Sequence, residues 1–90
     1  MHVGVCTINL CILESRSLTD KRRVIKSVKD RFNVSIAEVG LQNAYQSAVI
    51  GVVSVSGDQH HLNKVLSHVV AFVEKIHLVE LVDYKIELAY

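Results

Sequence analysis

The sequence contains no proline and no tryptophan, and only two cysteines, four glycines and 6% aromatic residues among its 90 residues. Cys6 and Cys11 lie in one apolar, alternating segment, so they are about 17 Å apart if that segment is a strand with ~3.4 Å per residue. The Cα atoms of a disulfide lie within about 7 Å of each other, so these two cysteines cannot pair. Unpaired cysteines are typical of a reducing compartment, and we expect a cytoplasmic protein.

Long hydrophobic runs are also absent, although half of the residues are hydrophobic. No stretch approaches the roughly 18 apolar residues of a membrane-spanning helix. The N-terminus has neither the basic region nor the cleavage site of a signal peptide, so we expect no membrane partner. Charged residues make up 21% of the chain and the formal net charge is +1. This composition argues against a disordered chain and against a highly charged nucleic-acid-binding tail.

Motifs of catalysis and cofactor binding are absent too. The sequence has no glycine-rich phosphate loop, no Gly-x-Ser-x-Gly and no Cys-x-x-Cys. His61 and His68 are about 10 Å apart along a helix with ~1.5 Å rise per residue, which is too far for one zinc ion. We therefore expect no metal, no cofactor and no enzymatic activity. Glu38 is the one carboxylate within a largely apolar run, and we interpret it as a strand-end residue that faces water.

The hydrophobic pattern that is present predicts four strands and two amphipathic helices. Their order is that of a ferredoxin-like α+β domain, βαββαβ, which we expect to span residues 1–90. Such a domain has an antiparallel four-stranded sheet with both helices on one face. Ser17 and Asp20 resemble a capping box at the start of the first helix. The strands are predicted at 2–13, 34–39, 47–56 and 78–90. The first helix is predicted at 18–32, and the second follows the turn and cap residues Ser56, Gly57 and Asp58, with its apolar positions at 62–76.

The sheet face without helices should be polar, but the sequence predicts an apolar one. Strand 47–56 is apolar on both faces, and strand 2–13 adds either Val3 and Val5 or the set that begins at Cys6. A small domain with such a face is often covered by a partner subunit, so we predict a homodimer through the sheet. The alternative is that strand twist and the loop around Asn43 shield this face.

One segment of the sequence is strongly basic. Residues 16–31 hold seven basic residues and two acids, a net charge of +5, whereas the rest of the chain carries −4. Basic side chains at helical spacing can neutralise several phosphates together, but they are also typical of an ordinary solvated helix face. The predicted central strands hold no aromatic residue on which an RNA base could stack. The candidate binding residues are Arg16, Lys21, Arg22, Arg23, Lys26 and Lys29.

Three segments resemble the small bacterial YlxP-like proteins of unknown function. They are residues 17–28, 31–39 and 46–56, and they include the patterns S-L-x-x-K-R and F-N-V-S-x-A-E-V. The resemblance covers nearly the whole chain and departs from the family pattern at Asn43 and Tyr45. It implies a ferredoxin-like fold and no established activity. Members are often encoded among transcription and translation factors, which implies an accessory role at RNA or the ribosome.

Two functions therefore remain open. The first is a non-enzymatic module that binds RNA or the ribosome through the basic helix, with an affinity that falls steeply with salt. The second is a dimeric regulatory or protein-interaction module that binds a small ligand or a protein partner, with weak dependence on salt.

Overall fold

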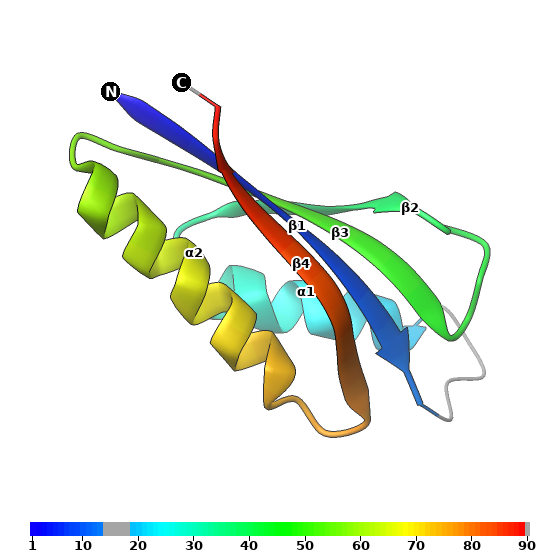
Figure 1. The fold of residues 1–90 in the computed structure, drawn as a ribbon. Coiled ribbons are helices and arrows are strands. Elements are labelled where there is room, and N and C mark those ends of the chain that lie inside the picture. The colour runs from blue at the N-terminus through cyan, green and yellow to red at the C-terminus, as the bar shows by residue number, and fades with distance from the viewer. Residues whose placement is uncertain (14–18, 90) are drawn as a thin grey trace.

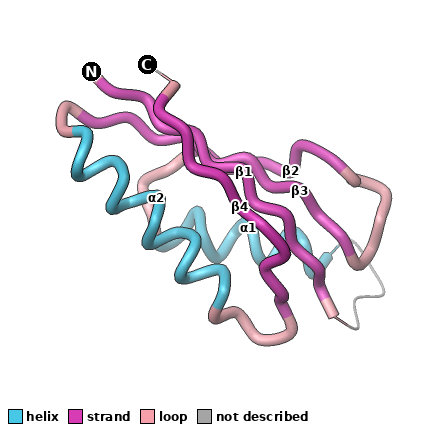
Figure 2. Tube along the Cα trace, viewed as in Figure 1, coloured by secondary structure: helices cyan, strands magenta, loops and turns pink. Residues whose placement is uncertain are grey.

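The computed structural model describes residues 1–13 and 19–89, and its elements follow the predicted order (Figure 1). The four strands form one antiparallel sheet in the order β2-β3-β1-β4. Both helices lie on the same face of this sheet, so the molecule has a helical layer and a strand layer (Figure 2). The ferredoxin-like prediction is confirmed. The elements are β1 (His2–Ile12), α1 (Thr19–Arg31), β2 (Ser35–Gly40), β3 (Ser47–Ser56), α2 (Gln59–Glu74) and β4 (Val79–Leu88).

Buried and partly exposed residues alternate strictly along β1, and the buried ones form the sheet side of the core. Every second residue from Cys6 to Ile12 is buried against the helices, and the residues between them face the other side of the sheet. Burial raises the pKa of the Cys6 thiol to about 11, so this cysteine stays a protonated thiol near neutral pH. The helices complete the core with Val24, Val28, Leu62, Leu66, Val69, Val70 and Val73.

Helix α2 begins at Gln59, directly after the predicted turn and cap residues Ser56, Gly57 and Asp58. The cap prediction is confirmed, because the Asp58 carboxylate accepts a hydrogen bond of 2.9 Å from the backbone amide of His60. Such a cap satisfies one of the amides left open at a helix start. Ser17, predicted to cap the first helix, lies outside the described residues. No helix within the described residues is long and apolar enough to span a membrane.

Both outer strands of the sheet are irregular. The pairing of β2 with β3 shifts register between Glu38 and Gly40, and the pairing of β4 with β1 shifts at Asn9 and Leu10. Bulges of this kind disrupt the row of open backbone groups with which an edge strand could pair to another chain. The edges are therefore poorer surfaces for pairing than the open face of the sheet.

Candidate functional site: the basic helix and the neighbouring pocket

Three basic residues of α1 form a single exposed row, which we call the basic row. Successive helix residues are about 100° apart, so Arg22, Lys26 and Lys29 fall within an arc of about 60°. All three side chains are exposed, whereas Val24 and Val28 of the same helix are buried against the core. The row therefore lies on the solvent side of the helical layer.

Two acids of α1 neutralise part of this surface. Lys26 Nζ lies 2.9 Å from an Asp30 carboxylate oxygen, and an Arg23 guanidinium nitrogen lies 3.8 Å from Asp20. Among the described residues, Arg22 has no ion-pair partner. Lys29 has none either. Exposed pairs at this spacing contribute little to stability, and their cations remain accessible to a competing phosphate.

Lys21 does not belong to the exposed surface, and its prediction as a phosphate contact is wrong. Its side chain is 1% exposed, and its ammonium nitrogen lies 2.7 Å from a Glu38 carboxylate oxygen. The same nitrogen donates a second hydrogen bond of 2.8 Å to the backbone carbonyl of Leu41. The prediction that Glu38 faces water is also wrong, because this carboxylate points into the helical layer. Through these two contacts, Lys21 connects α1 to the end of β2 and the residue that follows it.

The sequence did contain a signal for this buried pair. Lys21 precedes Val24 by three residues and Val28 by seven, so it lies on the apolar stripe of α1. Glu38 is two residues after Ile36, which places both side chains on the same face of β2. A single cation and a single anion at apolar positions of neighbouring elements indicate a buried ion pair. The remaining candidate, Arg16, lies outside the described residues.

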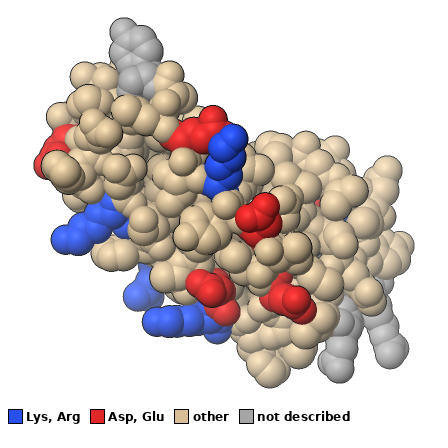
Figure 3. Space-filling model, in the orientation of Figure 1, with Lys and Arg blue, Asp and Glu red and all other residues tan. Residues whose placement is uncertain are grey.

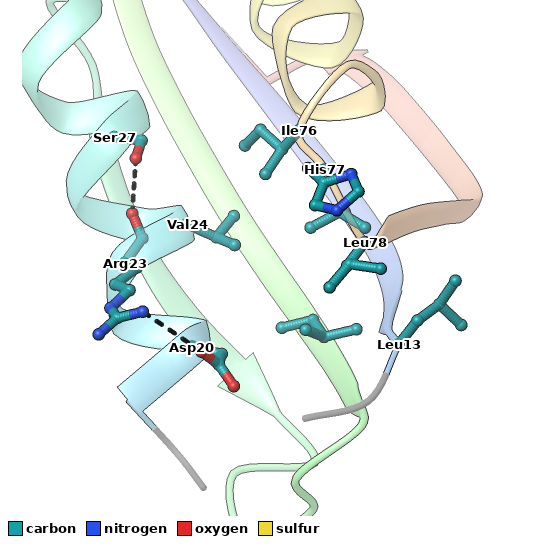
Figure 4. A pocket seen from close by; sticks show the side chains of 10 residues that line it. Leu13, Asp20, Arg23, Val24, Ser27, Ile76, His77 and Leu78 are labelled. Atoms are coloured by element: carbon teal, nitrogen blue, oxygen red, sulfur yellow. Dashed lines mark hydrogen bonds and ion pairs between the residues drawn. The ribbon is translucent and has the colours of Figure 1, made fainter. Parts of the chain in front are cut away.

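A pocket of about 380 Å³ opens beside the start of α1 (Figure 4). Asp20, Arg23 and Ser27 line it from α1, and His77 lines it from the connection between α2 and β4. The Ser27 hydroxyl donates to the Arg23 carbonyl at 2.8 Å. Sequence reasoning missed this pocket because three distant segments form its walls. The apolar lining residues are Ile12, Leu13, Val24, Ile76, Leu78 and Val79.

The face with α2 and β4 carries separate acidic and basic side chains on a mostly uncharged surface (Figure 3). Within residues 1–13 and 19–89, no group of three or more His, Cys, Asp or Glu side chains could hold a metal ion. The basic row on α1 is thus the main concentration of one charge in the described helical layer.

Comparison with known proteins places the chain in a family. Residues 3–86 match the family model described as "Protein of unknown function (DUF503)". The chain belongs to this family. A relative of the DUF503 chain is the "Uncharacterized protein YlxP" of Bacillus subtilis (strain 168), which is 33% identical over 82 residues. The matched region covers 87% of this chain and 89% of that protein, so the YlxP-like resemblance is confirmed.

Proposed function

We propose that this DUF503 protein is a non-enzymatic module that binds RNA through the basic row of α1. The observation that carries the proposal is the exposure of Arg22, Lys26 and Lys29 on one side of a single helix. The row extends over about 10 Å at ~1.5 Å rise per residue, so it can meet more than one phosphate. Binding of several phosphates together releases counterions and gives affinity without base contacts.

The surrounding structure favours the helix over the sheet as the RNA-binding surface. The sheet offers no aromatic side chain on β1 or β3 for stacking with a base. Val24 and Val28 of α1 are buried against the core, so the basic row on the opposite side of the helix faces solvent. Contacts to phosphates position a protein on RNA but do not read its sequence. We therefore expect binding with little sequence preference.

The first test is fluorescence anisotropy with labelled ribosomal RNA fragments at several salt concentrations. The variant Arg22→Glu/Lys26→Glu/Lys29→Glu is expected to lose most of its affinity. Loss of three phosphate contacts lowers the slope of log affinity against log salt by about 2.1 to 2.7.

A matched control separates the basic row from the net charge. The variant Lys64→Glu/Lys75→Glu/Lys85→Glu makes the same change in net charge, but its exposed lysines lie outside α1. We expect the slope of log affinity against log salt for this control to differ from that of the native chain by no more than the contribution of about one phosphate contact. Equal losses in both triple variants would contradict a specific role for α1, and so would an absence of RNA binding by the native chain.

A second candidate function rests on the pocket beside α1. Its volume of about 380 Å³ is within the usual range for small-molecule sites, and its apolar floor is bordered by Asp20, Arg23 and His77. This lining favours a small molecule with an apolar body and a charged or zwitterionic end. The protein would then be a regulatory ligand-binding module, with the ligand held between α1 and β4.

Thermal unfolding with leucine, 4-methylpentanoate and isopentylamine at millimolar concentration tests this candidate. The three probes share an apolar body and differ in their charged end, so the one that raises the Tm identifies the group recognised. Ser27→Phe places a bulky side chain at the pocket and should abolish the rise. If none of the probes changes the Tm, or if the rise persists in Ser27→Phe, the pocket is not such a site.

A further inference from the structure

We propose that a second copy of this chain covers the open face of the sheet, with its strands stacked on β3 and β1. No described residue covers this face, which lies opposite both helices (Figure 1). Val39 of β2 and Val55 of β3 are each 60% exposed, and Val53 is also exposed. Val3 and Val5 of β1 extend the same apolar surface, because they pair with Val55 and Val53 across the sheet.

A shallow apolar groove gives this surface its shape. Gly51 lies on the open face of β3 between two valines, and the Val39 side chain leans over it: a Cβ atom on Gly51 would lie 3.1 Å from Val39. The resulting depression of about 230 Å³ is bordered by Ala37 and Val53. Since valine knobs and a groove occur on the same face, two copies can fit each other as an isologous pair.

The charges of β4 determine how the copies stack. On the open face, β4 carries Glu80, Asp83, Lys85 and Glu87, which pair with the open-face residues of β1. A two-fold axis across the strands would place β4 over the partner's β4 and bring these acids together. An axis along β3 instead places β2 over the partner's β1 and leaves both β4 strands beyond the overlap. The apolar strands then form the interface core and β4 forms its charged rim.

The area of this overlap sets the expected strength of the dimer. In this arrangement β3 overlaps the partner's β3 over about 33 Å, whereas the six-residue β2 overlaps β1 over only about 20 Å on each side, so strands about 4.8 Å apart cover roughly 350 Å² per copy. The total of roughly 700 Å² is smaller than a standard interface, so we expect a weak dimer that dissociates in the high-micromolar range. The interface leaves α1 on the outer side of each copy. The dimer interface and the proposed RNA-binding row therefore use different surfaces. A test of one does not depend on the outcome for the other.

Sedimentation equilibrium from low micromolar to several hundred micromolar protein tests the proposal. The native chain is expected to rise from its monomer mass of 10.0 kDa to twice that value. Val55→Glu puts a charge into the interface core and should keep the chain monomeric over the whole range. Val82→Glu is the matched control, because Val82 is 63% exposed but lies at the irregularity of β4, outside the apolar surface. It should dimerise like the native chain.

A further variant keeps the test decisive if Val55→Glu does not fold. Val39→Glu changes a neighbouring strand of the same surface, and circular dichroism shows which variants retain the native fold. A folded variant at either position that still dimerises would overturn the proposal, because another surface would then form the contact. A native chain that stays at 10.0 kDa throughout would overturn it as well. Loss of the dimer in Val82→Glu would equally contradict this interface.

Discussion

Replacement of Lys21 by methionine is expected to destabilise the protein by about 3 kcal/mol, because it leaves the carboxylate of Glu38 without its buried partner. Methionine keeps most of the apolar packing of the lysine stem, so the loss reports the charge and its hydrogen bonds. The Glu38 side chain is 18% exposed, which favours the lower end of the range for a broken buried pair. The midpoint of urea unfolding at fixed protein concentration measures the effect.

Lys26→Met is the control for this prediction. It makes the same substitution in the same helix and also breaks a lysine–carboxylate pair, but the pair with Asp30 is exposed. Its expected cost is about 0.5 kcal/mol or less. In the double variant Lys21→Met/Glu38→Leu, no buried charge remains, and most of the lost stability should return. Equal costs of Lys21→Met and Lys26→Met would show that the buried pair has no special role.

The fold was predictable because local patterns and the global architecture agree. Alternation in β1 places Cys6 and Val5 on opposite faces of the sheet but does not say which face the helices cover, and the structure places Cys6 on the helix side and Val5 on the open side. The start of α2 was predictable from residue type and not from hydrophobic periodicity, because Ser56, Gly57 and Asp58 are turn and cap residues and Asp58 does cap the helix.

The candidate site was only partly predictable, because charge alone does not distinguish an exposed lysine from a paired one. Lys21 and Lys26 are five residues apart in the same basic segment, yet one is buried and the other exposed. Their difference arises from the position of Glu38 on β2, which is a tertiary relation. The pocket beside α1 was not predictable, since Asp20 and His77 meet there only through the packing of the helical layer.

Leu66→Ala is expected to cost about 3 to 4 kcal/mol, because it removes a fully buried side chain where α2 packs on β1. Gly4 lies directly beneath this leucine: a Cβ atom at Gly4 would lie only 2.7 Å from a Leu66 methyl carbon. Gly4→Ala alone is therefore expected to cost about 1 to 3 kcal/mol through overpacking. Gly57→Ala is its control, since no atom lies within 4 Å of an added Cβ there and the backbone φ is not positive.

The double variant Gly4→Ala/Leu66→Ala should be more stable than the sum of the single losses predicts. Truncation of Leu66 opens the space that the new methyl group at Gly4 requires, so the second change partly relieves the first. A cycle of urea unfolding experiments on the two single variants and the double variant measures this coupling, which we expect to be about 1 kcal/mol or more. Additive losses would show that α2 and β1 can move apart to admit the methyl group. The close approach at Gly4 would then be a consequence of helix packing and would not determine the position of α2.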